Sequence, residues 1–169
     1  MIQKRKLKRV QNKRLRKFYD DIEVVIHPQS IIHSMVEYID GAIIAELGMP
    51  DMKLPIQYAL FYPDRRPLNT KRVNFFELQT MSFEKPDLNV FRGLDLAYKA
   101  ATTGGTMPTV FNAANERAVE MFLNRKIGFL DIYELIEKSM DNHKVIIEPG
   151  VGEILEAEKE TYEFIAGLN

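Results

Sequence analysis

The chain contains no cysteine among its 169 residues. Disulfides, thiolate nucleophiles and cysteine-ligated zinc are therefore excluded, and the absence fits a reducing compartment. No apolar run approaches the roughly 18 residues that a membrane-spanning helix needs. The N-terminus is basic, but the apolar stretch of a secretory signal does not follow it. These absences indicate a cytoplasmic protein.

Sequence patterns for binding nucleotides or metals are also missing or incomplete. Gly150-Val151-Gly152 begins like a dinucleotide fingerprint but lacks the third glycine and a clear preceding strand, so its simplest role is a turn before the last helix. There is no Walker-type loop, and no HExxH, CxxC or calcium-loop pattern. His27 and His33 have acidic residues nearby, but nothing in their spacing compels them to share a metal. The residues themselves predict no cofactor site and no metal site.

What the chain does contain is an uneven distribution of charge. The formal net charge is −1, yet nine of the 23 Lys and Arg residues precede Asp20, with no acidic residue among them. We interpret residues 1–20 as a basic arm, disordered or helical. Such an arm could bind nucleic acid or an anionic membrane.

The residue pattern in the first half of the remaining chain predicts a small sheet. Runs of β-branched and apolar residues at 22–26, 32–39 and 42–47 are typical of strands. Asp40-Gly41 predicts a type I′ hairpin turn, in which both central residues need a positive φ. A short helix is expected over 56–61 and another strand over 75–83. A sheet of two or three strands is marginal alone, so this one must pack on helices or on another chain.

The second half is helical by periodicity. We expect one helix that ends at Gly104-Gly105, a second over 108–124, a third that Asp131 caps and a fourth after Gly150. The apolar side of the fourth comprises Ile154, Leu155, Ala157, Tyr162, Ile165 and Leu168. The fold class that follows is α+β: a small, mostly antiparallel sheet with a hairpin, followed by a C-terminal helical bundle.

His33 is the most notable single residue, because it lies beside Ser34 in an otherwise apolar segment. Either a hydrogen bond to backbone or a functional role would explain it. His27, Gln29 and Ser30 fit turn formers that satisfy buried backbone groups. The residues alone do not reveal what chemistry the chain performs.

Two segments resemble the 1-deoxy-D-xylulose 5-phosphate reductoisomerase family. They are HPQSIIHSMVEYIDGAIIAELGMPDMKLPIQYAL at 27–60 and FNAANERAVEMFL at 111–123. The resemblance implies part of an enzyme of non-mevalonate isoprenoid synthesis that uses NADPH and Mg²⁺ or Mn²⁺ to make 2-C-methyl-D-erythritol 4-phosphate. It also implies a division of the chain. Residues 1–20 would be the arm, 21–49 the end of the catalytic and dimerisation sheet domain, 50–85 a connection, and 86–169 a four-helix domain.

The same resemblance singles out particular residues. His33 matches a histidine close to the family's catalytic pocket, and Pro50 and Met52 match its apolar wall beside substrate and nicotinamide. The NADPH domain and the metal-binding carboxylates lie in motifs that precede His27 and are not found here. A faint echo of one such motif places Arg16 where a carboxylate should be, and a guanidinium cannot coordinate a cation. We therefore expect a homodimer through the sheet, but no metal or coenzyme bound to this chain alone.

Three functional hypotheses follow. In the first, the chain is the C-terminal portion of a reductoisomerase and is inactive by itself. In the second, it is a repurposed dimerisation module whose basic arm binds nucleic acid or a membrane. In the third, it completes an enzyme together with a separately encoded N-terminal half.

Overall fold

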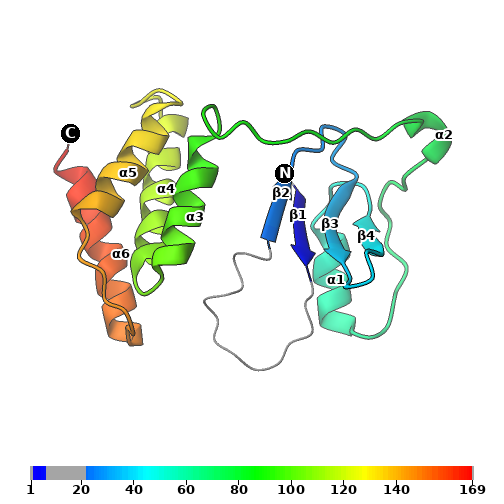
Figure 1. The fold of residues 1–169 in the computed structure, drawn as a ribbon, viewed down its shortest axis with the longest axis horizontal. Helices are drawn as coiled ribbons and strands as arrows, with labels where there is room; N and C mark the ends of the chain where they lie inside the picture. The colour runs from blue at the N-terminus through cyan, green and yellow to red at the C-terminus, as the bar shows by residue number, and fades with distance from the viewer. Residues whose placement is uncertain (1, 7–21, 169) are drawn as a thin grey trace. The chain divides into compact units, whose positions relative to one another are not determined.

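The computed structural model describes residues 2–6 and 22–168. Contacts divide the chain into a sheet unit up to Pro86 and a helical unit from Asp87 onward (Figure 1). The strands are β1 (Ile2–Lys6), β2 (Ile22–Val25), β3 (Ile32–Glu37) and β4 (Ile43–Leu47). The helices are α1 (Lys53–Phe61), α2 (Phe75–Leu78), α3 (Arg92–Thr103), α4 (Met107–Leu123), α5 (Asp131–Asn142) and α6 (Val151–Ala166). The expected α+β class is confirmed.

The sheet has the strand order β2-β1-β3-β4. β1 is antiparallel to β2 and parallel to β3, and β3 is antiparallel to β4, so the sheet is mostly antiparallel as expected. The expectation of a disordered or helical arm is wrong for residues 2–6, because β1 lies between two strands: Gln3 pairs with both Val24 and Ser34. Pairing on both edges satisfies the backbone of this polar segment, which outweighs its weak intrinsic preference for a strand. Residues 7–20 of the expected arm, Arg16 included, lie outside the described residues.

The β3–β4 hairpin is present, but its turn differs from the expected type I′. Of the two central residues Asp40 and Gly41, only Gly41 has a positive φ, +86°. The Gly41 N–H donates to the Tyr38 carbonyl at 3.0 Å, and the Tyr38 N–H donates to the Ala42 carbonyl at 2.8 Å. The loop is thus one residue longer than a type I′ turn, and Gly41 takes its left-handed position.

The strand expected over 75–83 is also wrong, because its first residues form α2. The Asn74 side chain caps this short helix, accepting from the Phe76 N–H at 3.1 Å and donating to Glu77 at 2.8 Å. This capping satisfies backbone groups locally and so competes with strand formation. Extended pairing begins only at Glu84, which exchanges two backbone hydrogen bonds with Ile26.

The core of the helical unit is built around α4. Val110, Ala114, Ala118 and Met121 follow its buried face at helical spacing, and each is at most 4% exposed. The alanines allow neighbouring helices to approach closely. Buried residues of the other helices complete the core: Leu96 and Ala100 of α3, Ile132, Leu135, Ile136 and Met140 of α5, and Ala157 and Ile165 of α6.

The expected inner face of α6 is partly wrong. Ile154, Leu155 and Leu168 are 37%, 58% and 47% exposed. The buried line is instead Ala157, Thr161 and Ile165, which are four residues apart. Thr161 can be buried because its hydroxyl donates to the Ala157 carbonyl at 2.6 Å, so that no polar atom of the side chain is left unsatisfied.

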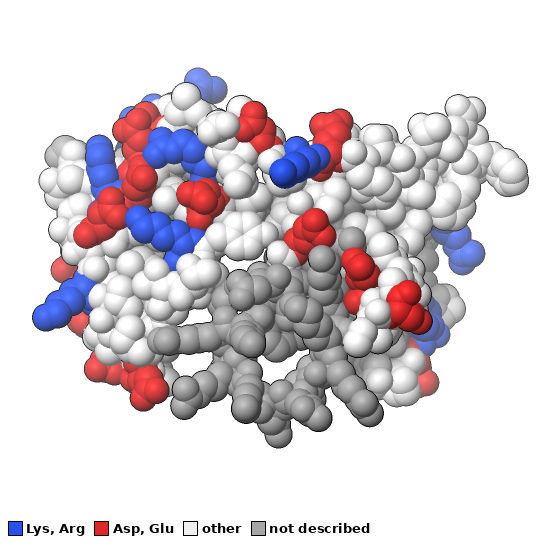
Figure 2. Space-filling model, in the orientation of Figure 1, with Lys and Arg blue, Asp and Glu red and all other residues white. Residues whose placement is uncertain are grey.

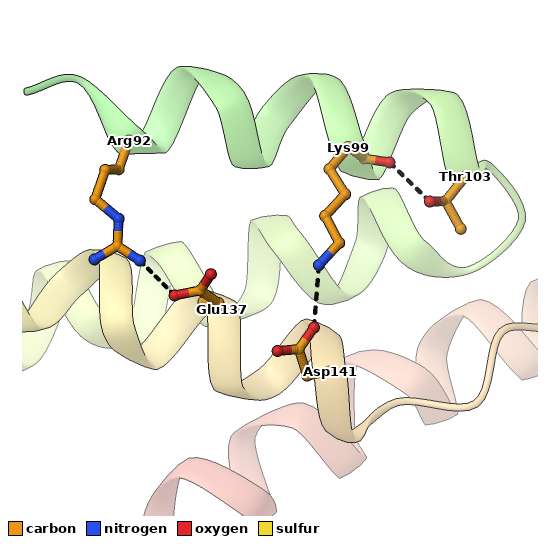
Figure 3. A network of polar contacts seen from close by, with 5 residues as sticks. All are labelled: Arg92, Lys99, Thr103, Glu137 and Asp141. Carbon is orange, nitrogen blue, oxygen red and sulfur yellow. Dashed lines mark hydrogen bonds and ion pairs between the residues drawn. The ribbon is translucent and has the colours of Figure 1, made fainter. Parts of the chain in front are cut away.

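Two ion pairs join α3 to α5 on the surface of the helical unit (Figure 3). Arg92 pairs with Glu137, and Lys99 Nζ lies 3.1 Å from Asp141 Oδ1. All four side chains are substantially exposed, and exposed pairs contribute about 1 kcal/mol or less. The bundle is therefore held together mainly by its apolar core.

Figure 2 shows acidic and basic side chains interspersed over the helical unit, whereas the region of α2 is largely free of charge on the face shown. Phe75 and Phe76 of α2 are 57% and 92% exposed. Among the described residues, no helix is both long and apolar enough to cross a membrane.

Candidate functional site

His33 lies at an irregularity in the β3–β4 pairing. Ile32 pairs with Leu47 and Ser34 with Glu46, so His33 is the extra residue on its strand. Such bulges bend a strand and redirect one side chain, and they are frequent next to active sites. The His33 side chain is about a third exposed, at 32%.

Both ring nitrogens of His33 face an acceptor. Nε2 lies 3.2 Å from the Ser30 carbonyl oxygen, and Nδ1 lies 3.4 Å from Glu46 Oε2. Ser30 adopts a positive φ of 52°, which is part of the turn that brings its carbonyl to the ring. The imidazole is therefore oriented from both sides, and in its protonated form it could donate to both acceptors.

Gly48 connects this histidine to the start of α1. A Cβ at Gly48 would lie 3.3 Å from Leu54 Cδ1 and 3.9 Å from His33 Cε1. The N–H of Gly48 donates to the Ile31 carbonyl at 2.9 Å, which ties the end of β4 to the residues before β3. The buried glycine thus lets the imidazole and the first turn of α1 approach the same point.

Pro50 and Met52 form the turn between Gly48 and α1, and both are exposed. Asp51 shapes this turn, because its carboxylate accepts the Lys53 N–H at 2.9 Å. Met52 is the N-cap residue of α1 and is 70% exposed. His33, Pro50 and Met52 thus all lie in the sheet unit, between the start of β3 and the start of α1.

His27 and Gln29 have a structural role. His27 is 4% exposed, and its Nδ1 lies 2.9 Å from the Ser82 carbonyl, to which it donates. Gln29 makes further hydrogen bonds to Ser82, from Nε2 to the hydroxyl at 2.9 Å and to Oε1 from the N–H at 3.2 Å. The turn formed by residues 27–30 therefore fastens the chain around Ser82 to the sheet, as the interpretation of these residues as turn formers predicts.

Neither a metal centre nor a glycine-rich cofactor loop can be built from the described part of the chain. No group of three or more His, Asp or Glu side chains there could hold a metal ion. Gly150 is the N-cap residue of α6, and its N–H donates to Glu153 Oε2 at 2.7 Å. The expected turn before the last helix is thus limited to Gly150, because Val151 and Gly152 already belong to the first turn of α6.

One titratable group of the helical unit is strongly perturbed. Partial burial, together with Glu116 and Glu158, raises the pKa of Tyr162 to about 12. Its hydroxyl donates to Glu116 at 3.0 Å and lies 3.3 Å from Glu158. Ionised tyrosine would face two carboxylates, so this side chain stays neutral at physiological pH and links α4 to α6.

Sequence reasoning did not find Glu46 or Gly48 as neighbours of His33. The simple alternation of side chains along a strand takes no account of the bulge, so it does not predict that His33 lies beside Glu46. No motif in the sequence marks the bulge. The cations at 66, 71 and 72 lie in residues 50–85, which the sequence identified only as a connection. Only the folded chain brings them to a groove next to Gly48.

Comparisons with known proteins agree with the resemblance. The model of the DXP reductoisomerase C-terminal domain family matches residues 47–164. A protein of Lachnoclostridium phytofermentans named 1-deoxy-D-xylulose 5-phosphate reductoisomerase is 62% identical over 145 residues, covering 85% of this chain and 37% of the relative. A protein of the same name from Agathobacter rectalis is 57% identical over 145 residues, covering 86% and 38%.

Solved structures give the same result. The reductoisomerase of Zymomonas mobilis in complex with NADPH is 42% identical, with a TM-score of 0.80 over 88% of this chain and 39% of that one. A DOX-P reductoisomerase in complex with NADPH, fosmidomycin and magnesium is 37% identical, with a TM-score of 0.81 over 88% and 38%. This chain therefore spans less than two fifths of the length of these relatives.

Proposed function

The chain belongs to the 1-deoxy-D-xylulose 5-phosphate reductoisomerase family, and from this we propose that it forms one wall of that enzyme's pocket for substrate and nicotinamide. The complete enzyme would convert 1-deoxy-D-xylulose 5-phosphate to 2-C-methyl-D-erythritol 4-phosphate with NADPH, in the cytoplasm. This chain would contribute the C-terminal part of that enzyme. No comparison favours the alternative of a module that binds nucleic acid or a membrane.

The observation that carries the proposal is the exposed apolar surface of α1 and the turn before it. None of the nine residues of α1 is buried. Met52, Ile56 and Leu60 are 70%, 52% and 74% exposed. An apolar surface of this kind usually marks a binding site for a ligand or another protein. A missing part of the enzyme, together with its ligands, would cover it.

The side chains of the wall suit this role. Met52 is flexible and polarizable, which fits contact with a nicotinamide ring and a short carbon chain. Pro50 and Met52 would exclude water from the reacting carbons, which strengthens electrostatic interactions inside the pocket. His33, oriented by Ser30 and Glu46, would lie beside the substrate and shape this side of the pocket, because both of its ring nitrogens already face acceptors of this chain.

Only part of the cofactor site would lie in this chain. Bound NADPH would supply the hydride, and Pro50 and Met52 would hold its nicotinamide ring against the substrate. The described residues do not fit a divalent cation, either Mg²⁺ or Mn²⁺, since no suitable group of ligands is present among them. We assign no step of this chain to a metal.

We also propose that two copies of the sheet unit associate through β4. β4 is an edge strand of the described sheet, with β3 as its neighbour. Ile43 and Ile44 point to opposite sides of this strand and are 50% and 62% exposed. An exposed apolar edge strand is a ready template for pairing with another chain. A homodimer formed in this way would extend the sheet.

Lysine in place of Ile44 should weaken this association at least about tenfold, because a charge on an edge strand opposes pairing. Sedimentation equilibrium of the full chain measures the effect. Leu123→Lys is the matched control, since Leu123 is 72% exposed but lies at the end of α4. Equal dimerisation of the parent chain and the Ile44→Lys variant would remove β4 from the interface.

Mixing this chain with the N-terminal portion of the Lachnoclostridium phytofermentans relative tests the proposed function. We expect neither part alone to oxidise NADPH in the presence of 1-deoxy-D-xylulose 5-phosphate and Mg²⁺, and we expect the mixture to do so. The reason is that the pocket is complete only when both walls meet. Turnover by this chain alone, or a tight complex without turnover, would contradict the proposal.

A further inference from the structure

A concave region lies in the sheet unit, next to the turn that holds Pro50 and Met52. It is an open groove of about 340 Å³ between the end of β4, the first turn of α1 and the connection from α1 to α2. Three cations line it: Arg66, Lys71 and Arg72. Thr70 and the apolar side chains of Leu54, Leu68 and Val73 also line it. We name it the cationic groove.

The three cations of the cationic groove make no ion pair with another described residue. No carboxylate is among the described residues that line the groove. The ion pairs of the described residues are made by other side chains, and none of them involves Arg66, Lys71 or Arg72. Like charges gathered in one depression repel one another, and an anion bound among them would relieve that repulsion.

Arg66 is partly preorganised for such an anion. Its guanidinium carbon lies 3.9 Å from the centroid of the Phe61 ring. This contact with the ring face restrains the planar guanidinium, while the N–H groups at its edge remain available to an acceptor. Nearby, Gln57 Nε2 donates to the Pro67 carbonyl at 3.3 Å, which fastens the connection to α1.

We propose that the cationic groove binds the phosphate or pyrophosphate group of a ligand whose remaining part is apolar. Arginine forks match phosphate oxygens in geometry, and lysine adds a point charge. Thr70 offers a hydroxyl for a further hydrogen bond. The apolar lining of Leu54, Leu68 and Val73 would accept the rest of the ligand. This inference goes beyond the proposed function and does not depend on it, because it concerns a groove that this chain forms by itself.

The test uses the full 169-residue chain and inorganic pyrophosphate as the probe. Titration followed by ¹H–¹⁵N spectra should move the amide signals of Gly48, Leu68 and Thr70, and calorimetry gives the affinity. Arg66→Gln, Lys71→Gln and Arg72→Gln should each weaken binding about tenfold, the effect of losing one hydrogen bond between charged groups. The affinity should also fall with added NaCl.

Arg65→Gln is the matched control. Arg65 is adjacent in sequence and also stacks on an aromatic ring, with its guanidinium carbon 3.7 Å from the Tyr58 centroid, yet it does not line the groove. This variant should retain the parent affinity within about twofold, the effect of a distant exposed charge. If Arg65→Gln and Arg66→Gln lowered the affinity for pyrophosphate equally, the anion would be binding to the net charge of the chain rather than to the groove, and the proposal would be overturned.

Two further outcomes separate sources of the anion. NADP⁺ that binds with the same signals and the same sensitivity to Arg66→Gln would show that the groove accepts a phosphate on a polar carrier, and would overturn the apolar part of the proposal. Pyrophosphate binding without NADP⁺ binding would identify a smaller or differently shaped ligand. Absence of pyrophosphate binding at low salt would contradict the proposal, whether or not the reconstituted enzyme is active.

Discussion

Replacing Gly105 by alanine should destabilise the helical unit by about 4 kcal/mol or more, which is exceptional for a single added methyl group. A Cβ at this position would lie 2.1 Å from the Ile146 carbonyl oxygen, and Gly105 has a φ of +58°. The same oxygen accepts the Thr106 N–H at 3.0 Å, and the Thr106 hydroxyl accepts the Ile146 N–H at 3.1 Å. The added methyl would push apart two backbone segments that hydrogen bonds hold together.

The neighbouring glycine provides the control. Gly104 also has a positive φ, +71°, but a Cβ there would meet nothing within 4 Å. Gly104→Ala should therefore cost only the backbone strain of a residue in this region, about 1–3 kcal/mol. Urea denaturation followed by circular dichroism at the helix band measures both variants. Equal losses at the two positions would mean that the approach to Ile146 does not limit stability.

A glutamate in place of Met52 should reduce kcat/KM of the reconstituted enzyme at least about hundredfold. Met52 would lie against the nicotinamide and the substrate, and a carboxylate in that apolar contact would be buried without a partner. An unpaired buried charge typically costs about 3–5 kcal/mol, and each 1.36 kcal/mol is a factor of about ten in rate. NADPH oxidation at limiting substrate, measured in the mixture with the N-terminal portion, gives this ratio.

Two controls accompany this variant. Met52→Leu preserves volume and apolarity, so kcat/KM should stay within about fivefold of the parent value. The denaturation midpoint of the isolated chain should change little with Met52→Glu, because Met52 is 70% exposed in it. Parent-like activity of the Met52→Glu mixture would place Met52 outside the pocket.

The helical unit was largely predictable from the sequence. Periodicity located four helices, and the buried residues Val110, Ala114 and Met121 lie on one face of α4 at helical spacing. The prediction succeeded where apolar spacing, a glycine stop and a turn coincide. It failed on α6, where Thr161 is buried and Leu155 is exposed, because the hydrogen bond of the Thr161 hydroxyl removes the cost of its burial.

The candidate site was predicted less completely. Family resemblance selected His33, Pro50 and Met52, and their roles remain a proposal. The Glu46 carboxylate beside His33 follows from the bulge in β3, which no local pattern in the sequence marks. The cations of the groove come from residues 50–85, which the sequence identified only as a connection.

The sequence by itself thus determined the class of fold, the helical bundle, the exclusion of cysteine chemistry and the family. These depend on composition, on spacing within one element or on a continuous motif. Only the tertiary structure decided that residues 2–6 pair inside the sheet, that His27 binds the Ser82 carbonyl 55 residues away, and that three cations share one groove. Such contacts form because the folded chain pairs its buried backbone N–H and C=O groups and buries apolar surface at the same time. Both depend on residues far apart in the sequence, so no local stretch predicts them.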